Sequence, residues 1–275
     1  MIRINGHEVK LETFGDNTLK CNSIDPSWLT RNHLGCAVSQ DTAMITWAYD
    51  NDAELFAVCC IAKELHESVD NVYLKLPYIP HARQDRKVSG RLFTLKAFAE
   101  IINSLNFKRV FVLDPHSDVS KALINNIREL DFRDFFNGLG DESATYDAIM
   151  FPDTGAAKKY ECFNTENLPV IIGNKHRNAE GRIESYDLLG FPEGVKSVRI
   201  VDDICSYGGT FVAAAKALRE RGVEKITLVV SHCENNILKG DVFKYIDRVF
   251  TTDSICTIEH PQLMVNKYFR GGFYV

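Results

Sequence analysis

The chain has 275 residues, of which 45% are hydrophobic, 25% charged and 11% aromatic. These fractions exclude a fibrous or largely disordered protein, and the length allows one large domain or two moderate ones. The 32 basic residues are outnumbered by 37 acidic ones, and the net charge of −5 excludes the broad positive field that nonspecific nucleic-acid binding requires. We therefore expect no nucleic-acid partner.

The N-terminal segment and the cysteines bear on the compartment. The opening residues, MIRINGHEVKLETF, lack the apolar stretch of a signal peptide, and no segment approaches the roughly 18 apolar residues of a membrane span. The eight cysteines include the adjacent pair Cys59 and Cys60, and the others are scattered, without the CxxC spacing of a zinc or redox site. We expect a cytoplasmic protein with reduced thiols and no membrane partner.

Short apolar segments alternate with amphipathic ones along the chain. Apolar residues at helical spacing predict helices over 53–66, 94–105 and 210–221, the last ended by Gly222. In that helix one face carries Phe211, Ala214, Ala215 and Leu218. Segments rich in β-branched and aromatic residues predict strands over 43–49, 72–76, 110–113, 146–151, 168–172, 198–201 and 226–230. The alternation predicts an α/β fold with mostly parallel sheets covered by helices on both faces.

One internal repeat in the order of predicted elements indicates two similar halves. A helix, a charged pair, an apolar strand and a histidine follow in that order from Thr94 to His116 and again from Thr210 to His232. The spacing is the same, since 116 − 94 and 232 − 210 are both 22. We predict an N-terminal lobe over 1–140 and a C-terminal lobe over 141–275, with the polar, glycine-containing stretch 137–145 as the linker.

The most informative segment is RIVDDICSYGGTF, residues 199–211. A predicted strand runs into Asp202 and Asp203, and a short loop then ends in Gly208, Gly209 and Thr210 at the start of a helix. Neighbouring residues of a strand point to opposite sides, so both carboxylates cannot enter the core. At the C-terminal end of a parallel strand they can address a ligand, while the glycines and the helix start suit an anion. The pattern predicts a sugar-phosphate site.

Two motifs together resemble a known family. VDDICSYGGT is similar to the phosphoribosyl-pyrophosphate motif of type I phosphoribosyltransferases and ribose-phosphate pyrophosphokinases. Residues 77–86, PYIPHARQDR, resemble the PYxxYARQDR stretch of the pyrophosphokinases, which the transferases lack. The resemblance implies two tandem type I phosphoribosyltransferase-like lobes, and it assigns to the ATP site Arg83, Gln84, Asp85 and Arg86.

Further matches follow in the family's order. Residues 14–16, FGD, resemble the start of its FSDGE adenine pocket and imply that Phe14 and Asp16 bind ATP. The DPH of residues 114–116 resembles its DLH turn, whose histidine, here His116, helps to hold Mg-ATP. Residues 51–65 and 89–98 resemble its NDNLMELLVMxDALR helix and its SARxPITAK stretch.

The C-terminal half continues the match. PDTG, residues 152–155, resembles the SPDxGG loop, which implies that Asp153 binds metal and ribose. NKHR, residues 174–177, resembles the DKRR of the catalytic loop and implies that Lys175 and Arg177 are catalytic together with His116. The resemblance covers nearly the whole chain from about residue 12, and we expect the family's first strand and helix to be missing.

The resemblance implies an ATP-dependent diphosphotransferase of nucleotide biosynthesis. The family transfers the β,γ-diphosphoryl group of ATP to the anomeric hydroxyl of ribose 5-phosphate and releases AMP. It implies Mg²⁺ near His116 and Asp153, and Asp202 and Asp203 on the ribose hydroxyls. The 5-phosphate would lie in the loop formed by Ser206, Tyr207, Gly208, Gly209 and Thr210. The expected partners are ATP, a ribose-phosphate acceptor and further copies of the chain, because the family's ATP site lies near a subunit interface.

One departure leaves the acceptor open. The family's phosphate loop reads DTGGT or DTAGT, whereas this chain has Ser206 and Tyr207 before the glycines. A tyrosine is bulkier than threonine and offers an aromatic face in place of a compact donor. An alternative acceptor is therefore a larger 5-substituted ribose such as ADP-ribose, which would give ADP-ribose pyrophosphate and link the protein to NAD metabolism.

Two other classes of function are weighed against this one. A phosphoribosyltransferase would use the VDDICSYGGT loop, but the ARQDR segment and the duplicated layout argue against it. A noncatalytic synthetase-associated protein should have lost the cations or the histidine of the active site, yet His116, Lys175 and Arg177 are all present.

Overall fold

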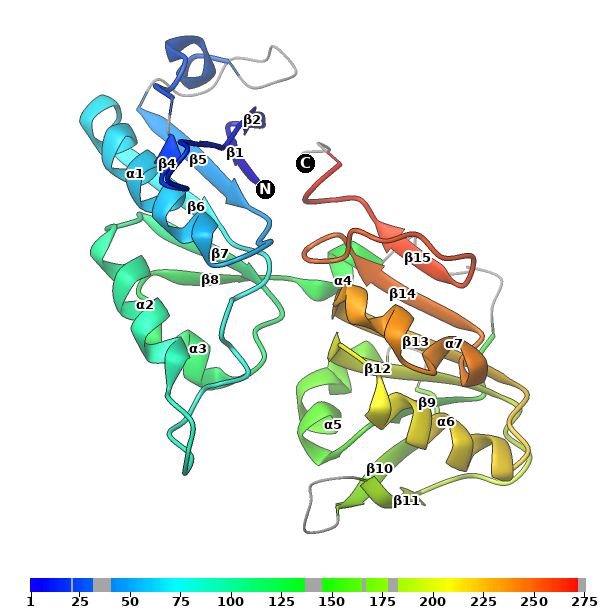
Figure 1. The fold of residues 1–275 in the computed structure, drawn as a ribbon. Helices are drawn as coiled ribbons and strands as arrows, with labels where there is room; N and C mark the ends of the chain where they lie inside the picture. Colours follow the sequence, from blue (N-terminus) through cyan, green and yellow to red (C-terminus); the bar gives the residue numbers. More distant parts are fainter. Residues whose placement is uncertain (21, 32–40, 137–144, 165–166, 178–182, 272–275) are drawn as a thin grey trace. The chain divides into compact units, whose positions relative to one another are not determined.

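The structure, a computed structural model, describes residues 1–20, 22–31, 41–136, 145–164, 167–177 and 183–271. It divides into two compact units, one of Met1–Asp131 with the C-terminal residues from Tyr268 onward, the other of Phe132–Lys267 (Figure 1). The predicted linker 137–145 lies outside the described residues except for Thr145. Each unit is an α/β lobe with a mostly parallel sheet flanked by helices, which confirms the predicted fold class.

The sheet of the first unit has six strands in the order β2-β1-β5-β6-β7-β8. Its parallel part consists of β5 (Thr42–Trp47), β6 (Asn71–Lys75), β7 (Arg109–Leu113) and β8 (Ile127–Leu130). The edge next to β5 is taken by a hairpin that the sequence did not predict, β1 (Ile2–Ile4) and β2 (His7–Val9), with β1 antiparallel to β5. A second small hairpin pairs β3 (Glu12–Thr13) with β4 (Leu19–Lys20) and precedes the short helix η1 (Pro26–Leu29).

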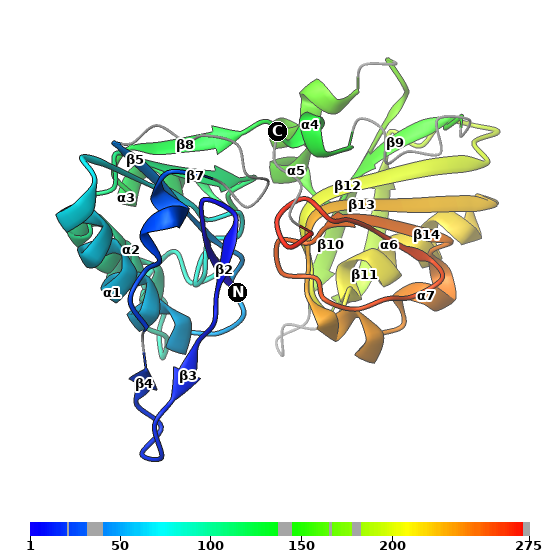
Figure 2. The same cartoon turned by 90° about the horizontal axis from the view of Figure 1, so that it is seen from above.

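The helices of this unit follow from its strand order. The chain passes from β5 through α1 (Ala53–Ser68) to β6, through α2 (Thr94–Ser104) to β7 and through α3 (Asp118–Leu123) to β8. Because each parallel crossover runs in the same direction and is right-handed, α1 and α2 lie on the same face of the sheet (Figures 1 and 2). Helix α1 buries Ala57, Ile61 and Leu65 at intervals of four residues. The predicted helices 53–66 and 94–105 are confirmed.

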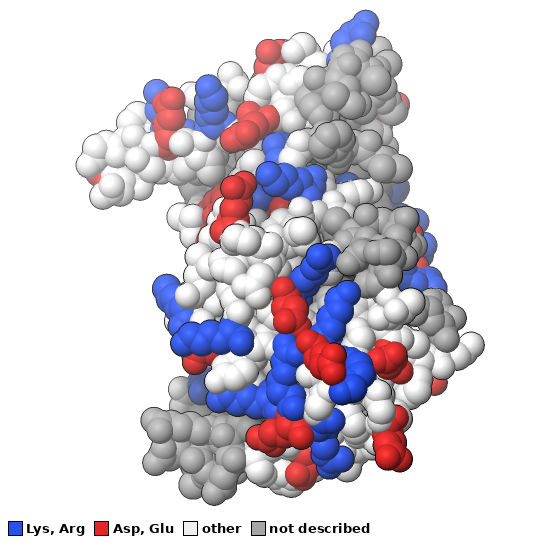
Figure 3. Space-filling model, turned by 90° about the vertical axis from the view of Figure 1, so that its right-hand side faces the viewer, with Lys and Arg blue, Asp and Glu red and all other residues white. Residues whose placement is uncertain are grey.

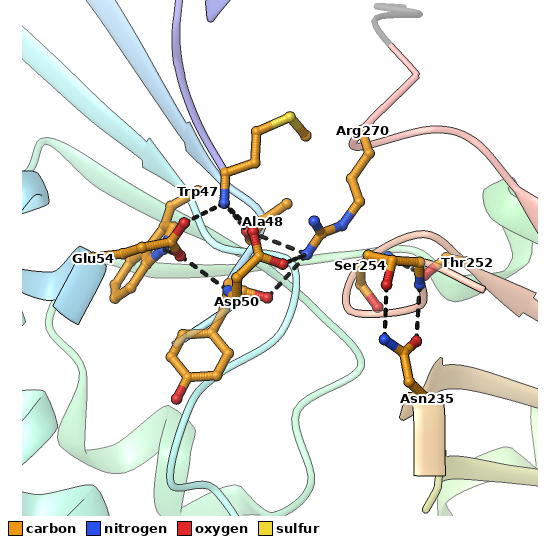
Figure 4. A network of polar contacts seen from close by, with 11 residues as sticks. Trp47, Ala48, Asp50, Glu54, Asn235, Thr252, Ser254 and Arg270 are labelled. Atoms are coloured by element: carbon orange, nitrogen blue, oxygen red, sulfur yellow. Dashed lines mark hydrogen bonds and ion pairs between the residues drawn. The ribbon is translucent and has the colours of Figure 1, made fainter. Parts of the chain in front are cut away.

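Polar contacts tie both ends of the chain to the first unit (Figure 4). The amino group of Met1 contacts Asp50 at 2.6 Å and also the carboxylate of Glu54. Arg270, 15% exposed, donates to the Asp50 carboxylate at 2.7 Å and to the carbonyl of Tyr49 at 2.9 Å. Burial of Asp50 favours its neutral form, but the hydrogen bonds and positive charges of Arg270 and the amino group outweigh this and lower the pKa of Asp50. The C-terminal segment therefore returns to the unit in which the chain begins.

The sheet of the second unit has seven strands in the order β11-β10-β9-β12-β13-β14-β15. Among the described strands of this sheet, only β11 (Ile183–Leu189) is antiparallel, against β10 (Val170–Arg177). The other strands are β9 (Ala148–Phe151), β12 (Ser197–Cys205), β13 (Lys225–Cys233), β14 (Arg248–Thr252) and β15 (Leu263–Asn266). The helices are α4 (Phe132–Phe136), α5 (Thr154–Tyr160), α6 (Gly209–Glu220), α7 (Val242–Tyr245), η2 (Glu161–Phe163) and η3 (Asn235–Lys239).

This strand order contains a reversal. From β9 the chain crosses through α5 to β10 on one side, whereas from β12 it crosses through α6 to β13 and then to β14 on the other side. Right-handed crossovers in opposite directions put α5 and α6 on opposite faces of the sheet. A crevice opens between such strands at their carboxyl ends, and ligands bind there in open α/β sheets. We therefore expect a ligand-binding site at the carboxyl ends of β9 and β12.

Helix α6 packs as its sequence predicts. Phe211, Ala214, Ala215 and Leu218 are buried, and Lys216 is exposed. Gly222 adopts a positive φ of 85° after the helix end, and the amide of Val223 returns to the carbonyl of Leu218. This is a conformation that glycine adopts without a steric penalty, so the predicted stop is confirmed.

The described surface mixes both signs of charge. Figure 3 shows basic and acidic side chains intermingled on one face. Exposed ion pairs such as Lys196 with Glu224 and Lys244 with Asp241 contribute to this mixture. The six described cysteines are free thiols, and no helix of the described residues is long and apolar enough to cross a membrane.

Candidate functional site

The first component of the site is the loop that follows β9. Asp153 caps α5, and its carboxylate accepts a hydrogen bond from the amide of Ala156 at 3.0 Å. The ammonium of Lys175, on β10, donates to the same carboxylate at 2.9 Å. Burial favours neutral Asp153, but the amide and Lys175 outweigh it and lower the pKa of Asp153. The structure thus brings together two residues that the sequence assigned to separate motifs.

The second component is the end of β12. This strand continues through both acids to Cys205 and pairs there with Cys233 of β13, so the predicted strand 198–201 is too short at its C-terminal end. The sequence could not show this, because the polar residues that suggested a loop are held in the sheet by pairing with a neighbouring strand. Asp203 is 6% exposed and lies 4.0 Å from the ammonium of Lys159 on α5.

The carboxylates of this site influence one another. Burial raises the pKa of Asp202, and the negative charges of Asp203 and Asp153 raise it further. Asp153 on one side of the strand reversal and Asp202 on the other therefore share one electrostatic environment. Carboxylate oxygens are also the ligands that a divalent cation such as Mg²⁺ prefers.

Two residues that sequence reasoning missed lie beside the carboxylate cluster formed by Asp153, Asp202 and Asp203. Tyr186, opposite Lys175 in the β10–β11 register, donates its hydroxyl to the carbonyl of Pro152 at 2.9 Å. A Cβ on Gly173 would come within 2.0 Å of that hydroxyl, so only glycine leaves room for the tyrosine. Lys159 supplies a cation beside Asp203. Nothing in its local sequence marks it, because its role depends on the packing of α5 against β12.

The third component is the loop between β12 and α6. Gly208, at the N-cap of α6, has a φ of 76°, and a Cβ there would lie 2.1 Å from a methyl group of Val242. A Cβ on Gly240 would lie 2.0 Å from the carbonyl oxygen of Tyr207. Both glycines are needed for the close approach of two loops. The start of α6, with Gly209 and Thr210 in its first turn, presents amide groups that suit an anion.

The two residues that depart from the family's loop have distinct surroundings. The hydroxyl of Ser206 donates to the carboxylate of Glu234, a residue of the loop after β13 that the sequence did not single out. Tyr207 is 55% exposed, so its ring is available to a ligand.

The first unit carries most of the predicted ATP residues, those of the ARQDR segment and His116, on the loops after β6 and β7. Asp85 is 7% exposed and accepts from the guanidinium of Arg86 at 2.9 Å, while the carboxamide oxygen of Gln84 accepts from the hydroxyl of Thr94. The pKa of Asp85 is lowered chiefly by Arg86 and also by Ser117 and His116. The ARQDR loop and the DPH turn therefore lie close together, and Arg83 and His116 are exposed beside them.

A further contact braces the ARQDR loop. His81 stands where the family stretch has tyrosine, has a φ of 63°, and contacts the carboxylate of Asp52 at 3.1 Å through its Nε2. The hydroxyl of Tyr49 donates to the same carboxylate at 2.9 Å. Burial is the main cause that raises the pKa of Tyr49, so its hydroxyl remains protonated and continues to donate.

The remaining predicted residues occupy simpler positions. Phe14 lies at the turn between β3 and β4 with 55% of its surface exposed, and Asp16 accepts hydrogen bonds from the amide and hydroxyl of Thr18. Lys175 and Arg177 end strand β10, where the resemblance implied a loop; the Arg177 side chain lies outside the described part of the chain. Adenine binding by Phe14 and Asp16 stays a prediction.

The predicted metal residues belong to different units, His116 to the first and Asp153 to the second. A shared magnesium site between them stays a prediction. Within the residues that the structure describes, no group of three or more histidine, cysteine or acidic side chains has a geometry ready to hold a metal.

Comparison with known proteins points to one family. Residues 171–262 match the model of the phosphoribosyl transferase domain. A ribose-phosphate pyrophosphokinase of Marinomonas sp. is 31% identical over 225 residues, which cover 76% of this chain and 69% of that protein. The enzyme of the same name from Mycoplasma genitalium is 29% identical over 228 residues, 74% of this chain and 65% of that protein. This chain thus spans about two thirds of the length of these relatives.

A solved structure gives the same result for the fold. The phosphoribosylpyrophosphate synthetase of Mycobacterium smegmatis superposes with a TM-score of 0.72 over 94% of this chain and 85% of that chain, at 20% identity. The similarity extends over both lobes, whereas the phosphoribosyl transferase model matches only part of the second.

Proposed function

This chain belongs to the ribose-phosphate pyrophosphokinase family, a family of diphosphotransferase enzymes, and we propose that it transfers the β,γ-diphosphoryl group of ATP to the anomeric C1 hydroxyl of a ribose phosphorylated at its 5-position. The acceptor that the relatives' name implies is ribose 5-phosphate, which would give phosphoribosyl pyrophosphate and AMP.

The observation that carries the proposal is the arrangement at the strand reversal of the second unit. Asp202 and Asp203 lie near the carboxyl end of β12, where the charge of Asp153 reaches Asp202, and the loop from Ser206 to Thr210 leads from this strand into α6. Carboxylates accept hydrogen bonds from vicinal hydroxyls, and amides at a helix start bind phosphate. A ribose that carries a 5-phosphate offers both groups, vicinal hydroxyls and a phosphate, on one molecule.

The reaction needs positioning and positive charge more than covalent help. The anomeric oxygen attacks the β-phosphorus in line, the bond from that phosphorus to the α,β-bridging oxygen breaks, and AMP leaves with that oxygen while the hydroxyl proton is lost. In this proposal Asp202 and Asp203 orient the ribose, and Lys175 and Arg177 stabilise the charge on the transferred group. In the structure, Lys175 donates to the carboxylate of Asp153. When ATP binds, Lys175 would leave this carboxylate and contact phosphate oxygens instead.

ATP is assigned to the first unit. The guanidinium groups of Arg83 and Arg86 and the adjacent His116 form an exposed polar surface beside the partly buried Asp85. Mg²⁺ would be held with ATP by His116 and near the ribose by Asp153, where the acidic cluster suits it, and it would offset the negative charge of the phosphates. The exposed Phe14 on its hairpin would complete the adenine pocket of another copy in a homo-oligomer.

A second acceptor is favoured by one observation. Tyr207, 55% exposed beside the phosphate loop, can stack on a group attached beyond the 5-phosphate. ADP-ribose has a free anomeric hydroxyl and carries such a group, an adenosine. The same transfer would then yield ADP-ribose pyrophosphate.

The test is AMP release from Mg-ATP with ribose 5-phosphate and with ADP-ribose, followed by phosphorus NMR of the products. A new C1 diphosphate together with AMP is the expected result for at least one acceptor. ATP binding without AMP release would instead favour a noncatalytic partner protein. A reaction that requires a nucleobase acceptor and does not depend on ATP would favour a phosphoribosyltransferase.

A further inference from the structure

The loop after β13 places a carboxylate next to the phosphate loop. Glu234 directly follows β13, and its amide donates to the carbonyl of Cys205, the last residue of β12, at 2.8 Å. Its own carbonyl accepts from the amide of Ile237 at 3.1 Å. The backbone of Glu234 is therefore fixed against the strand that leads into the phosphate loop.

The Glu234 side chain is held in place as well. One carboxylate oxygen accepts from the hydroxyl of Ser206, the first residue of the loop, and from the carboxamide nitrogen of Asn236 at 3.1 Å. The side chain is part-buried, so solvent screens its charge less than at an exposed position. The absence of a side chain at Gly240 allows this loop to approach the carbonyl of Tyr207 closely.

This arrangement opposes a terminal phosphate. A hydroxyl group donates one hydrogen bond, and Ser206 already gives it to Glu234, so a phosphate in the loop would lose that donor. A terminal phosphate also carries nearly two negative charges at neutral pH, against one for each phosphate of a diester or diphosphate bridge. Its repulsion by a neighbouring carboxylate is correspondingly about twice as large.

We propose that Glu234 is a specificity-determining residue that disfavours a 5-terminal phosphate and selects a ribose whose 5-phosphate is esterified, with ADP-ribose as the representative acceptor. This inference rests on the proposed diphosphotransferase activity and decides between its two acceptors. The exposed ring of Tyr207 supplies the matching attraction, because it lies next in the chain after Ser206 and can contact the group beyond the bridge. Repulsion of one acceptor and contact with the other act in the same direction.

The experiment compares kcat/KM for ribose 5-phosphate and ADP-ribose, measured as AMP release by the full chain. The wild-type protein is expected to prefer ADP-ribose by at least about tenfold. Glu234→Gln keeps the size and an acceptor for Ser206 while it removes the charge. It should raise kcat/KM by about tenfold for ribose 5-phosphate and by only about threefold for ADP-ribose, because the repulsion of a singly charged phosphate is about half as large. Direct titration of the two acceptors into each variant checks that the change is in binding.

Two control variants separate charge from other effects. Glu224→Gln removes the same charge at the opposite end of β13, where Glu224 pairs with Lys196, and should leave the preference unchanged. Ser206→Ala breaks the hydrogen bond but keeps the carboxylate, and it should not improve use of ribose 5-phosphate.

The outcomes distinguish this inference from the function on which it rests. A wild-type preference for ribose 5-phosphate, or a Glu234→Gln variant with an unchanged ratio, would overturn the role of Glu234 while AMP release upheld the diphosphotransferase activity. The same holds if Ser206→Ala shifts the ratio as Glu234→Gln does, because the charge would then not be the cause. Absence of AMP release with either acceptor in a folded protein would overturn both.

Discussion

The two sheets differ in how strand order follows chain order. In the first unit β5, β6, β7 and β8 lie side by side in the order in which the chain makes them. In the second unit the chain leaves β9 toward β10 and leaves β12 toward β13, so the order reverses between β9 and β12. Only the second arrangement creates a crevice between parallel strands at their carboxyl ends.

The chemistry of the two units follows this difference. In the second unit Asp153 follows β9 and Asp202 lies on β12, on either side of the reversal, and the negative charge of Asp153 contributes to the raised pKa of Asp202. In the first unit Asp85 lies on the long loop after β6 and His116 on the short loop after β7, and the two approach each other there. A strand reversal thus makes a compact site from strand ends, whereas a sheet in chain order depends on its loops.

Of the substitutions that test this comparison of the two units, Lys175→Ala is expected to have the largest effect, a loss of turnover. If the second unit holds the reacting group, loss of this cation should lower kcat by about 10²–10³-fold and leave ATP affinity nearly unchanged. The measurements are AMP release and ATP titration. Lys158→Ala removes an exposed charge from the neighbouring helix α5 and serves as the control. Unchanged turnover in Lys175→Ala would show that the cluster in the second unit is structural.

Substitution of two glycines that have similar positive φ values tests how tightly each unit is packed around them. Gly208→Ala places a Cβ 2.1 Å from Val242, whereas Gly90→Ala in the first unit meets no atom within 4 Å, and the two φ values are 76° and 77°. Backbone strain of about 1 kcal/mol is then common to both, and overpacking adds roughly 1–3 kcal/mol only at Gly208. Urea unfolding should show the larger loss for Gly208→Ala. Equal losses would mean that the loop before α6 can move away from Val242.

The stability of the two units should also change with pH in opposite directions. The pKa of Asp202 is raised above its ordinary value of 3.8 to about 8, so the folded second unit retains a proton that the unfolded chain releases, and its stability falls as pH rises through this window. The pKa of Asp50 in the first unit is lowered, so its contribution is lost as pH falls below about 4.

The measurement for this prediction is the melting temperature at pH 5 and pH 8 without ligands. Asp202→Asn removes the titrating group and should reduce the difference between the two pH values by a few °C. A difference that is the same in the variant and in the wild type would contradict a raised pKa for Asp202. Asp241→Asn, at an exposed carboxylate of the same unit, should behave like the wild type.

Phe14→Ala has the smallest expected effect on stability. Its side chain is 55% exposed on the β3–β4 hairpin, so the free energy of unfolding should change by less than about 0.5 kcal/mol. If Phe14 contacts adenine in another copy of the chain, KM for ATP should rise several-fold nonetheless. Val88→Ala, at another exposed apolar side chain of the first unit, provides the comparison. An unchanged KM would remove Phe14 from the ATP site.

Much of the fold could be predicted from local patterns. The buried face of α6 and its stop at Gly222 follow from apolar spacing and from the conformational freedom of glycine. The hairpin of β1 and β2 was missed because its strands are three residues each, too short for a periodicity to show. The extension of β12 through Asp202 and Asp203 was missed because pairing with β13, a tertiary contact, holds polar residues in an extended conformation.

The sequence by itself determined the types of residue that this protein offers: adjacent carboxylates, a glycine-containing helix start, the ARQDR segment and the cations Lys175 and Arg177. These lie in short motifs, in which chemistry depends on residues that are neighbours in the chain. Only the tertiary structure placed Lys175 on Asp153, Lys159 beside Asp203 and Glu234 on Ser206. Lys159 and Glu234 lie in a helix and a loop without a motif of their own. The packing of α5 against β12 and the pairing of β13 with β12 bring them to the site, and both are tertiary contacts.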